Sequence, residues 1–149
     1  MPTPHYERIK EFMQKAGQDT PEGAVRPPDE TRVLRAKLIL EEALETVEAL
    51  GVRVASKGAP LTEEGLSYEA DDAFDLEMVV DGCADISVVT IGTLIAIGVD
   101  DEPVLEEVDE ANLRKFADGG YRREDGKWMK PAAWQAPDIM AAIDRGYGR

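Results

Sequence analysis

Acidic side chains recur at helical spacing in a segment that includes Glu41, Glu42 and Glu45. With about 100° of rotation per residue, Glu41 and Glu45 lie within about 40° of each other, and Glu42 lies about 60° further round. Carboxylates spaced i, i+4 repel each other by a few tenths of a kcal/mol when solvated, and by more when partly desolvated. We therefore expect a positive partner between these carboxylates.

The same rotation places Leu34 and Leu38 on the acidic side of this segment, and Arg35 and Thr46 on the opposite side. The acidic face then continues an apolar strip, so we expect it to point inward or into a cleft. A Glu-rich helix in a chain of net charge −14 is more often a solvated surface, so this segment alone does not carry the prediction.

A second segment repeats the pattern with Glu77, Asp81 and Asp85 at i, i+4 and i+8. From Ile86 onward it is apolar around nearly its whole circumference, which is typical of a central, buried helix, so we expect these acids to point at the core. An unpaired buried carboxylate costs several kcal/mol or takes up a proton. The alternative is plain structure, in which Asp81 and Asp85 pair with an arginine or cap backbone groups.

Two such clusters predict a shared hard cation. Carboxylate oxygens without histidine or thiolate partners suit Mg²⁺ or Mn²⁺ and not zinc. We therefore expect Mg²⁺, for which Mn²⁺ can substitute.

Positive charge is concentrated near the carboxyl end, where six of the 17 basic residues fall between positions 114 and 130. They are Arg114, Lys115, Arg122, Arg123, Lys127 and Lys130. A polyphosphate needs metal ions for some of its oxygens and lysine or arginine for the others. Asn112, one helical turn before Lys115, could contact a sugar or phosphate or cap backbone groups; the alternative for the whole segment is a solvated hairpin.

These residues are carried by a chain that we expect to be all-α and a single domain over residues 1–149. Apolar spacing predicts helices over 4–16, 31–50, 75–97, 101–116 and 139–143. Asp29 or Thr31 and Asp100 or Asp101 are candidate caps. Residues 51–74, with a turn at 57–60, predict a flexible or partly hairpinned connection, and Asp125-Gly126 predicts a hairpin in the tail.

Composition narrows the function classes. The negative charge disfavours nucleic-acid and membrane-surface partners. The single cysteine, Cys83, fits a reducing compartment, the first residues lack an apolar run typical of a signal peptide, and we expect the cytoplasm. The apolar stretch over residues 86–99 is shorter than the roughly 20 residues of a bilayer span, which indicates a core helix.

At four places the sequence resembles the all-α nucleoside triphosphate pyrophosphohydrolases, the MazG-like and phosphoribosyl-ATP pyrophosphohydrolase-like superfamily. These places are Glu41-Glu42-Ala43-Leu44-Glu45, Asp81-Gly82-Cys83-Ala84-Asp85, Glu107-Val108 followed by Asn112-Leu113-Arg114-Lys115, and Asp125-Gly126-Lys127 with Lys130-Pro131. The resemblance implies a four-helix-bundle-like MazG fold with a short C-terminal hairpin or extended tail. The last two places resemble phage and bacterial MazG-like enzymes that act on deoxynucleotides such as dUTP.

The resemblance also implies roles for the acids. Glu42, Glu45 and Asp85 would be Mg²⁺ ligands, and Glu41 would orient or deprotonate the attacking water. The second motif of the superfamily commonly has Glu three positions before its Asp, where this chain has Gly82. Asp81 is the natural substitute ligand, because residues i and i+4 share a helix face.

The implied reaction converts a nucleoside triphosphate to a monophosphate and pyrophosphate. Lys115, Lys127 and Lys130 would hold the outer phosphates, with Asn112 near the sugar. A homodimer or homotetramer is expected, because the helices are too few to cover the apolar segment after Ile86. The alternatives are phosphoribosyl-ATP as substrate and a non-catalytic acidic helical interaction module. A di-iron bundle is disfavoured because the only histidine, His5, lies outside both acidic motifs.

Overall fold

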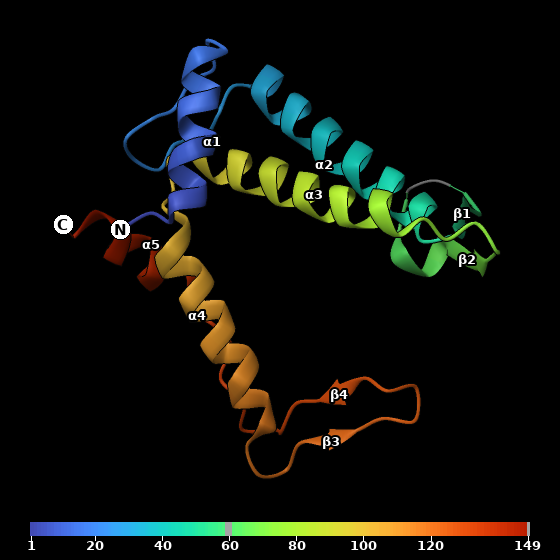
Figure 1. Cartoon of the computed structure of the whole chain (residues 1–149). Helices are drawn as coiled ribbons and strands as arrows, with labels where there is room; N and C mark the ends of the chain where they lie inside the picture. Colours follow the sequence, from blue (N-terminus) through green and yellow to red (C-terminus); the bar gives the residue numbers. More distant parts are fainter. Residues whose placement is uncertain (59–60, 149) are drawn as a thin grey trace. The chain divides into compact units, whose positions relative to one another are not determined.

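The computed structural model describes residues 1–58 and 61–148 and is mostly helical (Figure 1). Over these residues it has five α-helices, two short 3₁₀ helices and two small two-stranded sheets, which confirms the all-α prediction. The chain divides into two compact units, one of residues 1–25 with 94 onward, the other of residues 26–93. The expectation of a single domain stays a prediction.

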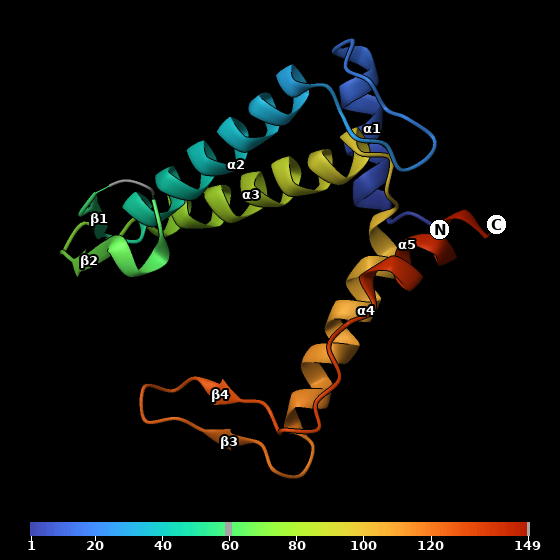
Figure 2. The ribbon, with the colours of Figure 1, turned by 180° about the vertical axis from the view of Figure 1, so that it is seen from behind.

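The unit of residues 26–93 is built on α2 (Asp29–Ala49) and α3 (Leu76–Ala96), whose last residues belong to the other unit. The two helices run side by side in both ribbon views (Figures 1 and 2). The cap of α2 is Pro28 without a side-chain hydrogen bond, so the prediction of Asp29 or Thr31 as cap is wrong. Asp29 instead pairs with Arg32 inside the first turn.

The connection between α2 and α3 is a β-hairpin. Strands β1 (Val52–Ser56) and β2 (Leu66–Ala70) pair antiparallel, and the 3₁₀ helix Glu63–Gly65 precedes β2. Gly51 ends α2 with φ 74°, and its carbonyl accepts a hydrogen bond from Asp71 N at 2.6 Å. The hairpin alternative is thus confirmed, while Ala59 and Pro60 of the predicted turn lie outside the described residues.

The buried face of α2 differs from the prediction. Arg35 and Thr46 are buried, at 8% and 5% exposure, whereas Leu40 and Leu44 are each 53% exposed. The expectation that Arg35 and Thr46 lie on the outer side is therefore wrong. The reason is steric, because Gly82 of α3 leaves room for Thr46: a Cβ at position 82 would lie 2.2 Å from Thr46 Oγ1.

Apart from Gly82, the buried residues of helix α3 lie in its second half. Val89, Ile91 and Ile95 are buried, but Leu76 and Val80 near its start are exposed. The first half of α3, which carries the acids, is therefore more exposed than the prediction of a central, buried helix requires. By length and composition α3 could cross a membrane, and 28% of its most apolar window is buried; a mostly buried core helix of a soluble protein passes the same test, so one such helix is weak evidence of a span.

The other unit contains α1 (Pro4–Lys15), α4 (Asp101–Leu113) and α5 (Ile139–Tyr147). Thr3 caps α1, since its Oγ1 accepts a hydrogen bond from Tyr6 N at 3.2 Å. Asp101 is 1% exposed and accepts hydrogen bonds from Thr3 N, at 2.9 Å, and from Thr3 Oγ1. The first residue of α4 thereby holds the start of α1 in place, and Asp100 is the N-cap residue of α4, without a side-chain capping bond.

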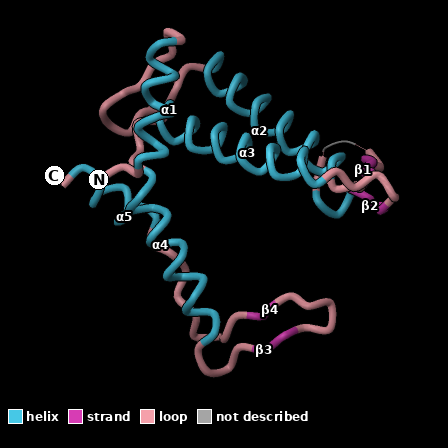
Figure 3. The backbone as a smooth tube through the Cα atoms, in the orientation of Figure 1, coloured by secondary structure: helices cyan, strands magenta, loops and turns pink. Residues whose placement is uncertain are grey.

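After α4 the chain forms the 3₁₀ helix Arg114–Phe116 and then a short hairpin (Figure 3). Strands β3 (Tyr121–Arg122) and β4 (Trp128–Met129) pair antiparallel, and Gly126 takes φ 90° in the turn. The predicted C-terminal hairpin is confirmed. Helix α5 extends four residues beyond the predicted end at Ile143.

Candidate active site

The acidic residues of α2 and α3 form one electrostatic cluster around Glu42, which is half-buried. Desolvation raises the pKa of Glu42 above its ordinary value, and nearby negative charges raise it further. These charges belong to Asp85, Glu45, Glu41 and Asp81. The other four predicted catalytic and metal-binding acids are therefore close enough to Glu42 to raise its pKa.

The cluster is more open than the sequence suggests. Asp85 is half-buried, but Glu41, Glu45 and Asp81 are exposed, and so is Glu77. The expectation that Glu77 and Asp81 point at the core is therefore wrong. Among the described residues, no three His, Cys, Asp or Glu side chains are placed to hold a metal ion, so the acids are gathered without forming a finished metal centre.

The donor chemistry of the cluster still fits a hard cation. Every charge that shifts the pKa of Glu42 comes from a carboxylate, and none comes from a lysine or arginine. The expected positive partner is thus not supplied by a neighbouring basic side chain. Oxygen donors of this kind are the ligands that Mg²⁺ and Mn²⁺ prefer.

Gly82 shows why this chain departs from the motif it resembles. The residue is buried where α3 meets α2, and a Cβ there would also lie 3.0 Å from Thr46 Cβ. A glutamate at this position would require Thr46 to move. The space that a side chain at position 82 would need is therefore occupied by Thr46 of α2.

The four predicted substrate-binding residues lie in the other compact unit and are close together. Lys115 Nζ donates a hydrogen bond to Asn112 Oδ1 at 2.9 Å. Lys115, Lys127 and Lys130 line one pocket of about 250 Å³, which we call the basic pocket. Trp128, Met129 and Trp134 complete its lining.

The two tryptophans are held by backbone hydrogen bonds. Trp128 Nε1 donates to Lys115 O, and Trp134 Nε1 donates to Ala111 O, both at 2.7 Å. The Trp128 ring also packs at 5.0 Å from the Phe116 ring, measured between centroids. The sequence left open whether these indoles stack on a base or pack; their N–H groups are used within the protein.

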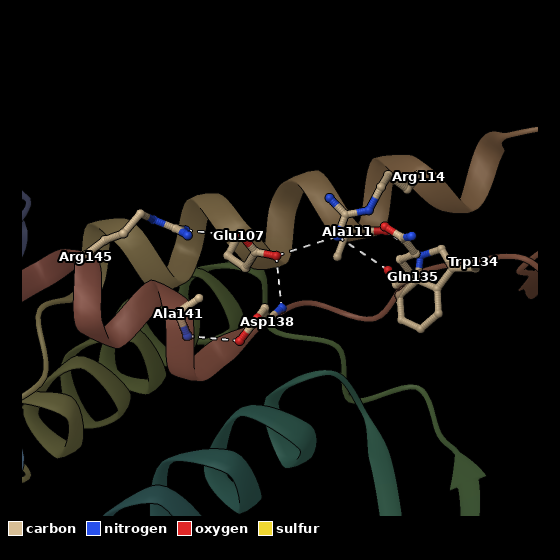
Figure 4. Close-up of polar contacts among 8 residues, drawn as sticks. All are labelled: Glu107, Ala111, Arg114, Trp134, Gln135, Asp138, Ala141 and Arg145. Atoms are coloured by element: carbon tan, nitrogen blue, oxygen red, sulfur yellow. Dashed lines mark hydrogen bonds and ion pairs between the residues drawn. The ribbon is translucent and has the colours of Figure 1, made fainter.

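Glu107 is a residue whose role the sequence did not reveal (Figure 4). Its Oε1 accepts a hydrogen bond from Asp138 N at 3.0 Å, and its Oε2 accepts one from Arg145 Nη2 at 3.2 Å. The hydrogen bond from Asp138 N, and next the one from Arg145, lower the pKa of Glu107. Glu107 thus ties α4 to the start and the body of α5; its partners are 31 and 38 positions away, so local spacing gave no signal.

The described chain is an all-α protein with carboxylates gathered on two neighbouring helices. The sequence profile of the family described as Phosphoribosyl-ATP pyrophosphohydrolase matches residues 7–112. This match spans well over half of the chain, so the chain belongs to this family of pyrophosphohydrolases. No curated protein matches it.

The matched region contains α2, α3 and all five clustered acids. It ends at Asn112, before the lysines and tryptophans of the basic pocket. The match therefore covers the acidic cluster and does not extend to the basic pocket.

Proposed function

We propose that this protein is a Mg²⁺-dependent nucleoside triphosphate pyrophosphohydrolase that releases a nucleoside monophosphate and pyrophosphate. The observation that carries the proposal is the half-buried Glu42, whose pKa is raised by desolvation and by four carboxylates with no basic group among them. A fold that gathers uncompensated negative charge loses stability, and a bound cation would offset that loss. Membership of a pyrophosphohydrolase family supports the same reaction.

In this proposal Glu42, Glu45 and Asp85 hold the cation, and Asp81 takes the place of the ligand missing at position 82. The cation, when bound, would neutralise phosphate oxygens and lower the pKa of a bound water. Glu41 is the candidate base, because it is exposed beside the cluster and can accept a proton from water. The residues that this proposal assigns to cation binding and catalysis all lie on α2 and α3, whereas the basic pocket belongs to the other unit.

For the substrate we propose a deoxynucleoside triphosphate such as dUTP. The support is the similarity of the later motifs to MazG-like enzymes, with Asn112 and Lys115 in a hydrogen-bonded pair. Phosphoribosyl-ATP is the second candidate, and the matched family is compatible with it. Both substrates carry the phosphoanhydride bond that this reaction breaks.

We also propose a homodimer or homotetramer. Val33, Leu40 and Leu44 form an outward apolar stripe on α2, and each is more than half exposed. Burial of apolar surface contributes about 25 cal/mol per Å², so a second copy that covers this stripe would be stabilised. Two helical hairpins joined in this way would also supply four helices.

The reaction is tested by pyrophosphate release from a panel of deoxy- and ribonucleoside triphosphates and phosphoribosyl-ATP, with and without Mg²⁺. Glu42→Gln and Asp85→Asn should abolish turnover and leave the circular dichroism spectrum unchanged. Glu48→Gln, an exposed glutamate of the same helix, is the matched control and should keep wild-type turnover. Unchanged pyrophosphate release in both acid variants would refute the assignment, and no turnover of any substrate by the wild type would favour the interaction module.

A further inference from the structure

Aspartate followed by glycine occurs three times in the chain, at positions 81–82, 118–119 and 125–126. In such a pair the backbone nitrogen of the glycine can attack Cγ of the aspartate, because glycine has no Cβ that hinders the approach. The attack requires a carboxyl group that is free to turn toward the nitrogen and an N–H that no hydrogen bond occupies. The three pairs differ in both respects.

Two of the pairs are protected by the structure around them. Gly82 is buried within α3, where each backbone N–H donates to the carbonyl four residues earlier. Gly126 N donates a hydrogen bond to Arg123 O at 2.9 Å. The Asp125 carboxylate is held as well, since it accepts hydrogen bonds from Arg123 Nε at 2.9 Å and from Lys127 N at 3.1 Å. In both pairs the attacking nitrogen is therefore engaged elsewhere.

The remaining pair, Asp118 and Gly119, lies in a turn between the second 3₁₀ helix and β3, and both residues are exposed. Gly120 N closes the turn by donating to Ala117 O at 3.2 Å. Gly119 has φ 94° as the third residue of this turn, a position whose N–H the closing hydrogen bond does not use. Over the described residues, no hydrogen bond or ion pair reaches the Asp118 carboxylate or Gly119 N. This pair meets both requirements.

We propose that Asp118 is a site of spontaneous isomerisation to isoaspartate, and that the fold protects Asp81 and Asp125 from the same reaction. Gly119 N loses its proton and bonds to Asp118 Cγ, and one carboxyl oxygen leaves as water, which gives a five-membered succinimide. Water then adds to either carbonyl of the ring. Addition at Cγ restores aspartate, whereas addition at the backbone carbonyl carbon breaks its bond to Gly119 N and leaves the main chain running through the side chain. The water released in the first step equals the water added in the second, so no co-reactant is consumed.

Isoaspartate adds one methylene group to the main chain at a place with little room. A Cβ on Gly120 would lie 2.6 Å from Lys115 O and 2.9 Å from Trp128 Nε1. Trp128 Nε1 donates its hydrogen bond to the same Lys115 O. A longer main chain at Asp118 would displace Gly120, so isomerisation should disturb this hydrogen bond and change the surroundings of the indole.

Trypsin separates the two exposed turns, because it cleaves after lysine and arginine. Residues 116–122 then carry only the pair at Asp118, and residues 124–127 carry only the pair at Asp125. The full chain is incubated at pH 7 and 37 °C in water enriched in ¹⁸O, digested in ordinary water and analysed by mass spectrometry. Each succinimide cycle adds one ¹⁸O, and fragmentation distinguishes isoaspartate from aspartate. We expect at least tenfold more ¹⁸O in residues 116–122 than in residues 124–127, and isoaspartate at position 118.

The matched variant is Asp118→Glu, which keeps the charge but would have to form a six-membered ring, a much slower reaction. It should abolish labelling of residues 116–122, whereas Asp125→Glu should leave that labelling unchanged. In urea the two peptides of the wild type should be labelled at rates within a few-fold of each other, because local sequence then acts without the fold. Equal labelling of the two peptides in the folded chain, faster labelling at Asp125 or Asp81, or a tenfold difference that persists in urea would overturn the inference.

Tryptophan fluorescence, followed during the same incubation, tests the structural consequence. The signal of the wild type should change in proportion to the isoaspartate content, and that of Asp118→Glu should stay constant. An unchanged signal after isoaspartate has accumulated, or an equal change in both proteins, would overturn this consequence. These outcomes are independent of the proposed function, which depends on the acids of α2 and α3.

Discussion

At the scale of single residues, Glu42 is the acid on which repulsion within the acidic cluster has its clearest effect. Its pKa is raised by desolvation first and by four carboxylates next, so its ionised form opposes folding at neutral pH. A folded-state pKa above the unfolded value means that the folded chain binds more protons, and stability falls as the pH rises through that pKa. The same charge that destabilises the metal-free chain is what would attract a cation.

The first prediction follows from this conflict. Glu42→Gln removes the charge at similar volume, so in EDTA at pH 7 the variant should have a higher Tm than the wild type. Addition of Mg²⁺ should raise the Tm of the wild type and should raise that of the variant much less. Thermal unfolding followed by circular dichroism measures both; a variant less stable than the wild type in EDTA would contradict the argument.

The pKa of Glu107 is shifted in the opposite direction to that of Glu42. Hydrogen bonds from Asp138 N and Arg145 lower its pKa, so its contribution to stability is present above the unfolded pKa, about 4.3, and is lost as the pH falls through the folded value. The Tm of Glu107→Gln should therefore lie below that of the wild type at pH 7, and the difference should shrink as the pH falls below about 4.3. Melting curves between pH 3 and pH 7 test this.

The control for this pH series is Glu106→Gln, an exposed neighbour on α4. It should follow the wild type across the whole range. A Tm difference for Glu107→Gln that is independent of pH would show that the side chain acts by packing and not by its charge.

Residue types were the most predictable part of the candidate site. Helix geometry is set locally, so spacing was sufficient to predict that Glu42 lies near Glu45 on one helix. That Asp85 of α3 joins them depends on the packing of α3 against α2. The roles of Glu107 and Trp134 could not be predicted. Each depends on a hydrogen bond to a residue more than 20 positions away, Asp138 N for Glu107 and Ala111 O for Trp134.

At the scale of elements, the contact between α2 and α3 depends on Gly82. The buried Thr46 hydroxyl donates a hydrogen bond to Glu42 O at 2.7 Å, so it is satisfied within its own helix and can face α3. Hydrophobic periodicity assigned the opposite face of α2 to the interior, because a threonine and an arginine count as polar. Apart from the C-terminal end of α5, the helix ends were predicted within three residues, whereas the rotation of α2 about its axis depended on one steric fit.

A methyl group at this contact gives the third prediction. In Gly82→Ala the new Cβ would fall within 3 Å of Thr46, and overpacking of this kind costs about 1–3 kcal/mol. The free energy of unfolding should fall by that amount in urea titrations. Turnover should fall too, because Glu42 and Asp85 lie on the two helices that are forced apart.

A double-mutant cycle checks the cause. Thr46→Ala removes the hydroxyl that would clash, so Thr46→Ala with Gly82→Ala should be less destabilised than the sum of the two single variants. Additive losses would show that the methyl group acts elsewhere, for instance on the backbone freedom of α3.

At the scale of the whole molecule, net charge and apolar exposure oppose each other. A chain of charge −14 repels its own copies, yet α2 exposes an apolar stripe that includes Leu40 and Leu44. Repulsion between exposed charges is screened within about 8 Å at physiological ionic strength, whereas burial of apolar surface is not. Association through this stripe should therefore strengthen as salt is added.

The last prediction tests that balance. The wild type should elute as a dimer or tetramer in size-exclusion chromatography with light scattering at micromolar concentration and 0.15 M salt. Leu44→Glu places a charge within the stripe and should give a monomer with an unchanged helical circular dichroism spectrum. Leu113→Glu, at a leucine of the other unit that is more exposed than Leu44, should leave the mass unchanged. A monomeric wild type would mean that something other than a second copy covers α2; equal dissociation by both substitutions would mean that negative charge, and not loss of the stripe, separates the subunits.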